Sequence, residues 1–256
     1  MTNADAVAPL APNAWLRFDV ITRMLPPGVR DVLEIGCGQG AVGARLAQRC
    51  SYVGVEPDET SYGVADARLK AMGAGEVRHQ SSTDLGAERF DLVCAFEVLE
   101  HVEDDAAALT EWTTHLRPGG WLLLSVPAHQ HRFGPWDEIV GHYRRYSPTD
   151  ITALLQRTGF TDVEVRQYGM PLGYLLETVR DAIGKRKLAA AEKDSFADRT
   201  AGSGRLYQPS GAVRGTVIRW ATAPFRVVQR AFPNRGVAIV VRARLASSVG
   251  SARRSG

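Results

Sequence analysis

The sequence predicts an α/β fold with a mainly parallel β-sheet. Short apolar runs that are typical of strands alternate with helical patterns from about residue 13 to residue 168, as they do in parallel sheets with helical crossovers. A glycine-rich stretch, GCGQG at 36–40, directly follows the first of these runs. A length of 256 residues with 45% apolar and 23% charged composition suits one sizeable domain with an insertion.

The N-terminal part predicts a helix followed by two strand–helix units. Apolar residues at helical spacing over 13–25 predict a helix that ends at the Pro-Pro-Gly break of 26–28. The apolar run 32–35 predicts a buried strand, and the small and apolar residues of 41–50 predict the helix after the glycines. Residues 52–58 and 61–73 repeat this order, and we expect residues 1–12 to form a flexible leader.

The following part predicts four more strands, with helices between them. A weak strand near Val77 precedes the apolar run 90–96, a helix over about 103–116, a turn at 117–120 and a strongly β-like run at 121–127. A helix over 147–159 then leads to a strand at 160–168. Residues 237–245 predict a closing strand, and 247–256 a disordered tail.

Charge is distributed unevenly along the chain. Residues 1–165 contain 14 basic and 23 acidic residues, whereas residues 166–256 contain 17 basic and 5 acidic residues. This asymmetry predicts that the C-terminal part meets an anionic partner, with a solvated basic face as the open alternative. Three widely spaced cysteines, at 37, 50 and 94, argue for a reducing cytoplasm and against a disulfide framework or a zinc cluster, so we expect no metal site.

The glycine-rich stretch fits two cofactor-binding patterns. Gly36, Gly38 and Ala41 match the dinucleotide fingerprint, whereas Glu34 followed by three alternating glycines matches the acidic loop of adenosylmethionine-binding proteins. In either case Glu56, at the end of the second strand, can accept the ribose hydroxyls. Glu34 favours adenosylmethionine, because a carboxylate beside the loop would attract its ammonium and sulfonium but repel the pyrophosphate of NAD.

Four segments together resemble the successive motifs of class I adenosylmethionine-dependent methyltransferases: VLEIGCGQG, VGVEPD, FDLVCAFEVLEHVED and LRPGGWLLLSVP. The resemblance covers about residues 29–168 and again 237–245. It implies a Rossmann-like sheet of seven strands with an antiparallel last strand and helices on both faces. It also implies that the glycines, Gly40 included, lie under the methionine part, that Glu56 binds the ribose, and that Asp84 and the Leu85 backbone meet the adenine. We also assign Cys37, Pro57 and Phe96 to the cofactor site.

Methyl transfer requires mainly that the nucleophile and the methyl group are aligned, so a base is needed only for a protonated acceptor. Strand ends at the carboxyl edge bring two segments to the methyl group, one after residue 96 and one after residue 127. The candidate catalytic residues are Glu97, His101, His142 and Tyr143. A hydrogen bond within its own turn stays open as the role of His101, and a structural or gating role stays open for His142 and Tyr143.

Residues 128–147 form the expected acceptor-binding lid. The lid combines imidazoles, an indole that can stack, and guanidinium groups suited to carboxylate or phosphate. Its candidate substrate-binding residues are His129, His131, Trp136, Arg144, Arg145 and Tyr146.

A basic helical insertion, residues 170–235, separates the sixth strand from the seventh and is expected to cap the acceptor side. The methyltransferase core is then 13–169 plus 236–246. Residues 211–233 either lie on anionic lipid or pack an apolar face on the core while their arginines face an anionic metabolite; we favour the second. We expect no nucleic-acid partner.

The sequence therefore predicts a cytoplasmic, adenosylmethionine-dependent methyltransferase, with membrane association left open. Its acceptor is expected to be an oxygen or nitrogen of a small metabolite, with phosphate- or carboxylate-bearing ones favoured. The alternatives are a methyltransferase acting on a lipid or quinone precursor at the membrane surface, an NAD-dependent oxidoreductase, and a non-catalytic methyltransferase-like protein.

Overall fold

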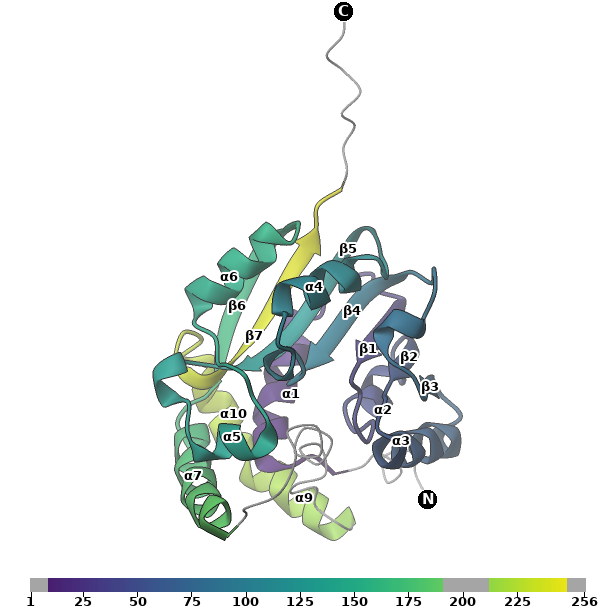
Figure 1. Ribbon diagram of the computed structural model, residues 1–256. Coiled ribbons are helices and arrows are strands. Elements are labelled where there is room, and N and C mark those ends of the chain that lie inside the picture. Colours follow the sequence, from purple (N-terminus) through teal and green to yellow (C-terminus); the bar gives the residue numbers. More distant parts are fainter. Residues whose placement is uncertain (1–8, 191–211, 248–256) are drawn as a thin grey trace, which may run out of the picture.

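A seven-stranded β-sheet forms the centre of the computed structural model, which describes residues 9–190 and 212–247 (Figure 1). The strand order is β3-β2-β1-β4-β5-β7-β6. The strands are β1 (Asp31–Ile35), β2 (Ser51–Val55), β3 (Glu76–Arg78), β4 (Phe90–Phe96), β5 (Leu116–Pro127), β6 (Phe160–Gly169) and β7 (Gly236–Leu245). Only β7 runs antiparallel to its neighbours, β5 and β6. The predicted mainly parallel sheet with an antiparallel last strand is confirmed.

Helices cover both faces of the sheet, so the central strands are buried on both sides. Side chains of β4 alternate between two apolar cores, with Val93 facing one and Leu92 the other. The first core includes α4 (Asp105–Thr113) and α6 (Pro148–Arg157). The second includes α1 (Pro12–Met24), α2 (Gly43–Leu46) and α3 (Glu59–Met72). This arrangement leaves the carboxyl ends of the parallel strands as the edge where a ligand can enter.

The segment after β5 contains a short helix that the sequence patterns did not predict. After η4 (Gln130–Arg132), α5 (Pro135–Val140) begins with a proline and ends at Gly141, whose φ of 76° terminates it. Asp137 accepts a hydrogen bond from the Gly134 amide at 2.9 Å and so closes the first turn. The expected lid is therefore a structured element and not an open loop.

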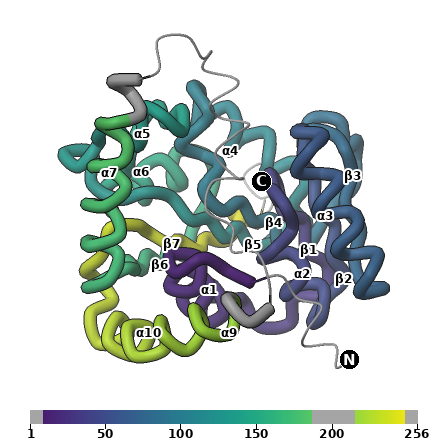
Figure 2. The backbone as a smooth tube through the Cα atoms, turned by 90° about the horizontal axis from the view of Figure 1, so that it is seen from below, coloured from purple at the N-terminus to yellow at the C-terminus, as the bar shows by residue number. Residues whose placement is uncertain are grey.

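Three described helices connect β6 to β7: α7 (Leu172–Ala190), α9 (Ala212–Ala221) and α10 (Ala223–Arg230). They lie at the same end of the molecule as α5 and the start of α1, as the view from below shows (Figure 2). Gln229 of α10 donates to the Leu16 carbonyl at 2.9 Å, and Arg230 pairs with Asp19 at 2.5 Å. The insertion is thus tied to α1 by one buried hydrogen bond and one partly exposed ion pair.

The favoured packing of the insertion on the core is wrong for part of its apolar surface. Ile218 and Phe225 pack against the second core, but Val217 is 62% exposed and Trp220 is 71% exposed. The reason is helix geometry, since the face of α9 and α10 that meets α1 is the one with Ile218 and Phe225. In the described part of the chain, no helix has both the length and the apolar character needed to span a membrane.

The expected flexible ends lie largely outside the described residues, which exclude 1–8 and 248–256. Within the described part, Leu10 is only 2% exposed and belongs to the second core. The expectation of a flexible leader is therefore wrong for Leu10, because this side chain is packed.

Candidate functional site

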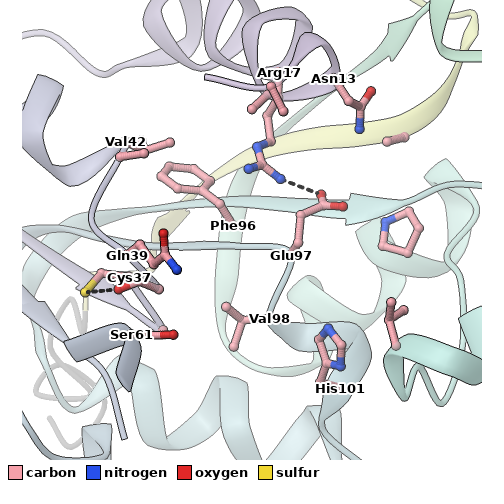
Figure 3. Close-up of a pocket in the computed structure, with 18 of the residues that line it drawn as sticks. Asn13, Arg17, Cys37, Gln39, Val42, Ser61, Phe96, Glu97, Val98 and His101 are labelled. Atoms are coloured by element: carbon pink, nitrogen blue, oxygen red, sulfur yellow. Dashed lines mark hydrogen bonds and ion pairs between the residues drawn. The ribbon is translucent and has the colours of Figure 1, made fainter. Parts of the chain in front are cut away.

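A cavity of about 990 Å³ opens at the carboxyl ends of β1, β2, β4 and β5 (Figure 3). Its walls come from the glycine loop, from the turn after β4, from α1, and from α5 and α7. Polar residues that line it include Glu34, Glu56, Glu97, His101, His142, Arg17, Asp137, Arg145, Glu177 and Arg180. One continuous space therefore joins the predicted cofactor side to the predicted acceptor side.

Gly36 and Gly38 of the loop both have a positive φ, which disfavours a side chain at either position. Gly36 has φ of 64°, and a Cβ there would lie 2.8 Å from Cγ2 of Val98. Gly38 has φ of 54° and open space around its Cβ position, and it lines the cavity. Gly40 does not line the cavity; its Cβ position lies 3.0 Å from Cβ of Ala65, so it allows the loop to pack on α3. Its predicted place under the cofactor is therefore corrected to a packing position.

Glu34 is a buried carboxyl group at the bottom of the glycine loop and is 2% exposed. It accepts a hydrogen bond from the Tyr52 hydroxyl at 2.6 Å. Burial raises the pKa of Glu34 from 4.5 to about 7, although Tyr52 and Arg17 favour the charged form. An ammonium or sulfonium in this part of the cavity would stabilise the ionised carboxylate, which suits the predicted cofactor.

Glu56 ties the end of β2 to the glycine loop. It accepts hydrogen bonds from the Gly38 amide at 2.7 Å and the Asp58 amide at 2.9 Å. Burial raises the pKa of Glu56 above its usual value, although both amides favour the charged form. Cys37, Pro57 and Phe96 also line the cavity. The residues present therefore fit a molecule with a cationic amino-acid part and a ribose diol, and their individual roles stay predictions.

Asp84 and Leu85 are not brought to the cavity. Asp84 accepts hydrogen bonds from the Ser81 amide at 3.2 Å and the Ser81 hydroxyl at 2.8 Å, which closes η2 (Ser82–Asp84). Leu85 is buried in the first core. Oδ2 of Asp84 accepts both bonds and so closes a local turn, and the predicted adenine contact stays a prediction.

Glu97 has an unusual backbone for a glutamate, with φ of 61°. Its carboxylate pairs with Arg17 at 3.4 Å and accepts hydrogen bonds from Ser125 at 2.9 Å and Tyr168 at 3.3 Å, and Figure 3 shows Arg17 reaching it from α1. Burial opposes the charged form, but Arg17 and Ser125 outweigh it and hold the pKa of Glu97 below its usual value. A carboxylate so held is a weak proton acceptor, which disfavours Glu97 as the general base.

Two imidazoles of the predicted catalytic set lie together at the acceptor side. The rings of His101 and His142 have their centres 4.7 Å apart. His101 Nδ1 lies 3.1 Å from the Gly141 carbonyl, and His142 Nδ1 lies 2.7 Å from the Asp137 carboxylate. Burial lowers the pKa of His101 to about 4, so this ring is neutral near pH 7. Both contacts require a proton on Nδ1, which leaves each Nε2 as the acceptor atom of the neutral ring.

Glu100 lies behind these imidazoles and is 0% exposed. Among the described residues, neither oxygen of its carboxyl group has a hydrogen-bond partner, and the contact to His142 Nε2 is 3.9 Å long. Burial raises the pKa of Glu100 well above its usual value. A buried carboxyl group without donors is rare in folded proteins.

The remaining predicted acceptor residues are largely used within the fold. Arg145 lines the cavity, donates to Asp137 at 2.7 Å and also pairs with Glu177. Arg144 pairs with Asp105 at 2.8 Å and does not line the cavity. Tyr146 is buried, donates to Asp105 at 3.0 Å and does not line the cavity. The sequence patterns did not predict these acidic partners, and the substrate-binding roles of the three residues stay predictions.

Of the other candidates, only Trp136 lines the cavity. His129 Nε2 lies 3.1 Å from both the Gln167 side chain and the Gly236 carbonyl, a position that links β5 to β6 and β7. His131 lies beside His129 and is exposed, and Tyr143 is 38% exposed. His129, His131 and Tyr143 are therefore not part of the cavity wall.

Sequence reasoning missed several residues of the cavity. Arg17 lay on a helix noted only for its apolar face, and Arg180 on a helix of the insertion. Asp137 stood inside the lid segment. Glu100, which does not line the cavity but lies beside its imidazoles, was also missed, although it stood between two residues that were already candidates. Arg17 is one of three charged residues in α1, with Asp19 and Arg23, so charge alone did not single it out.

Comparison with known proteins identifies relatives over most of the sheet. A family model described as a methyltransferase domain matches residues 11–165. A probable S-adenosylmethionine-dependent methyltransferase of Mycolicibacterium smegmatis is 33% identical over 158 residues, which are 58% of this chain and 60% of that protein. A ubiquinone biosynthesis O-methyltransferase of Xanthomonas axonopodis pv. citri is 35% identical over 134 residues, 48% of this chain and 54% of that protein. The chain thus spans little more than half the length of these curated relatives.

Solved structures share the fold at low sequence identity. A methyltransferase of Thermotoga maritima, described as a possible histamine N-methyltransferase, is similar with a TM-score of 0.55 and 20% identity over 90% of this chain and 88% of its own. Phosphoethanolamine N-methyltransferase 2 of Haemonchus contortus, in complex with S-adenosyl-L-methionine, is similar with a TM-score of 0.58 and 20% identity. The match covers 93% of this chain and 54% of that protein's chain.

Proposed function

Because this chain belongs to the S-adenosylmethionine-dependent methyltransferases, we propose that it transfers a methyl group from this cofactor to a hydroxyl oxygen of a small, anionic acceptor. The observation that carries the proposal is one cavity lined at one end by Glu34 and Glu56 and at the other by His101 and His142. When bound, the cofactor supplies an electrophilic methyl group with a good leaving group.

The residues at the cofactor end supply charge and shape. Glu34 would hold the amino-acid part by its negative charge, and Glu56 would accept the ribose hydroxyls. Gly38 leaves the space that a side chain would fill. These residues would hold the cofactor at the end of the cavity beside the glycine loop.

The residues at the other end favour an oxygen acceptor. Asp137 holds His142 through Nδ1 at 2.7 Å, so Nε2 is the atom that can accept a hydrogen bond from an acceptor hydroxyl. Arg17 and Arg180 line the same space and add positive charge, which supports a carboxylate- or phosphate-bearing acceptor. The O-methyltransferase name of the Xanthomonas relative also supports oxygen over nitrogen.

The test is a thermal-shift screen of hydroxylated carboxylates, hydroxylated phosphates and matched amines in the presence of the demethylated cofactor. Compounds that bind are then incubated with the cofactor, and the methylated product is identified by mass spectrometry. His142→Asn should lower kcat by at least about 100-fold while affinity for the demethylated cofactor stays unchanged, and His131→Asn is the matched control outside the cavity. Loss of cofactor affinity in His142→Asn, or methylation of amines alone, would contradict the proposal.

Action on a lipid or quinone precursor at a membrane surface is a second candidate. Val217, Trp220 and Val227 are each more than 60% exposed on α9 and α10, among several arginines, and such a surface suits anionic lipid. The test is co-sedimentation with anionic and with zwitterionic vesicles at two salt concentrations. Salt-sensitive binding to anionic vesicles that Trp220→Ser weakens would support this candidate, and absence of binding to either vesicle would refute it.

A further inference from the structure

The turn after β4 and the end of α5 bring three metal-ligating side chains together. Glu100, His101 and His142 each offer a ligand atom, and these atoms all lie within 4.8 Å of one another. Glu100 follows β4 within η3 (Leu99–His101), whereas His142 comes from the segment after α5, 42 positions further along the chain. From these three residues we propose that the protein binds one divalent transition-metal ion through Glu100, His101 and His142.

The hydrogen bonds of the two histidines leave Nε2 of each ring as the nitrogen that can bind an ion. His101 Nδ1 is taken by the Gly141 carbonyl at 3.1 Å, and His142 Nδ1 by Asp137 at 2.7 Å. The remaining ligand atoms are therefore the two Nε2 atoms. A metal-bound histidine generally donates its other ring N–H to a carboxylate or a carbonyl group, and both arrangements are present here.

Asp137 is itself held rigidly, so it fixes the ring of His142. It is fully buried and accepts hydrogen bonds from Arg145 and from the Gly134 amide, both under 3.0 Å. Arg145 pairs in turn with Glu177 of α7. This buried ion-pair network therefore fixes the orientation of the imidazole that offers Nε2.

Glu100 supplies the independent observation. Its side chain is completely buried, and among the described residues neither carboxyl oxygen has a hydrogen-bond partner. Such a group is costly to bury unless a partner compensates for it. A cation between Glu100 and the imidazoles would satisfy it, and no lysine or arginine of the described chain reaches it within 4.0 Å.

The donor set selects the class of ion. Two imidazoles and one carboxylate suit zinc, iron(II), manganese(II) or cobalt(II), whereas magnesium and calcium prefer oxygen ligands alone. Ligand atoms around a tetrahedral ion lie about 3.4 Å apart, so the side chains must close by roughly 1 Å from their present separations. His101 and His142 line the cavity and Glu100 does not, so the open coordination position faces the cavity.

A consequence for the acceptor rests on the proposed function. With the ion bound, His142 Nε2 would ligate the ion, and an acceptor hydroxyl would bind at the ion's open position instead of at Nε2. The three-residue site itself does not depend on this consequence, because metal binding can be measured without any acceptor.

The experiment measures stoichiometric metal binding to the full-length protein after removal of bound metal by a chelator. Zinc and manganese are titrated by calorimetry, and cobalt by its visible d–d absorption, which reports nitrogen and oxygen ligands. We expect one ion per chain, and an affinity at least about 100-fold lower in Glu100→Gln and in His142→Asn. His131→Asn, which removes an exposed imidazole beside His129, should leave binding unchanged.

Each variant is also titrated with the demethylated cofactor, which reports whether it is folded. Glu100→Gln removes a buried charge and is expected to fold, and His101→Asn serves as a second variant of the cluster. Absence of a stoichiometric site for all three ions in the unsubstituted protein, or unchanged affinity in a folded Glu100→Gln, would overturn the proposal. Metal binding without cofactor binding would instead contradict the proposed function but support the proposed metal site.

Discussion

Replacing Glu34 with Gln tests the role of this residue beside the glycine loop by two measurements, the stability of the protein and its affinity for the cofactor. The carboxyl group is 2% exposed, and burial raises its pKa from 4.5 to about 7. The unfolded chain ionises this group near pH 4.5 and the folded chain only near pH 7, so the folded protein binds more protons between these values. The unsubstituted protein must therefore lose stability as the pH rises from 4.5 to 7.

The size of this loss follows from the same pKa values. One pKa unit corresponds to about 1.4 kcal/mol, so the buried ionised carboxylate lowers the free energy of unfolding by roughly 3 kcal/mol above pH 7. Gln keeps an acceptor for the Tyr52 hydroxyl but carries no charge. The substitution should therefore raise the melting temperature by roughly 5–10 °C at about pH 8.5 and change it little at about pH 5.

The same substitution should weaken cofactor binding, because the buried carboxylate is the counter-charge for the cationic amino-acid part. We expect the dissociation constant of the demethylated cofactor to rise at least about 10-fold at pH 8. Melting curves between about pH 5 and pH 8.5, with and without the demethylated cofactor, check both effects. An equal change in melting temperature at all pH values, or undiminished cofactor affinity, would refute the assignment of Glu34.

Four further substitutions test other parts of the site. Arg17→Gln leaves the partly buried Glu97 carboxylate without its ion pair, so we expect about 1–3 kcal/mol of destabilisation at pH 8 and less at low pH, where Glu97 is protonated; chemical denaturation at both pH values measures this. Gly36→Ala should lower the free energy of unfolding by about 1–3 kcal/mol, since the added Cβ would lie 2.8 Å from the Val98 side chain. Gly38→Ala should mainly weaken cofactor binding. Melting curves measure the first effect, and calorimetric titration with the cofactor measures the second. Arg145→Gln should lower the free energy of unfolding by about 3–5 kcal/mol, because Asp137 and Glu177 each lose their ion pair with Arg145. A change in acceptor KM without loss of stability would instead support the predicted role of Arg145 in acceptor binding.

The order of strands and helices was predictable because it depends on local patterns. Buried strands such as the one containing Val93 appear as short apolar runs, and the glycine loop is marked by residues that must adopt positive φ. The antiparallel last strand, in contrast, came from family resemblance and not from periodicity. The exposed face of α9 could not be foreseen either, because a helical pattern does not say which of two apolar faces meets the core.

The polar part of the site was less predictable because its partners are distant in sequence. Arg145 pairs with Glu177, 32 positions away, and Arg17 pairs with Glu97, 80 positions away. Composition alone could identify Arg145 as a donor, but not that acidic side chains already bind it. His142, by comparison, was placed correctly beside the turn after β4, because the carboxyl ends of parallel strands meet at one edge of the sheet.

Calorimetric titration of the full-length protein with S-adenosylmethionine, its demethylated product and NAD tests the central claim most directly. We expect both forms of the sulfur cofactor to bind one equivalent per chain, more weakly in Glu34→Gln, and NAD to give no saturable heat. Saturable binding of NAD, or no binding of either sulfur cofactor, would contradict the methyltransferase function proposed for this cavity.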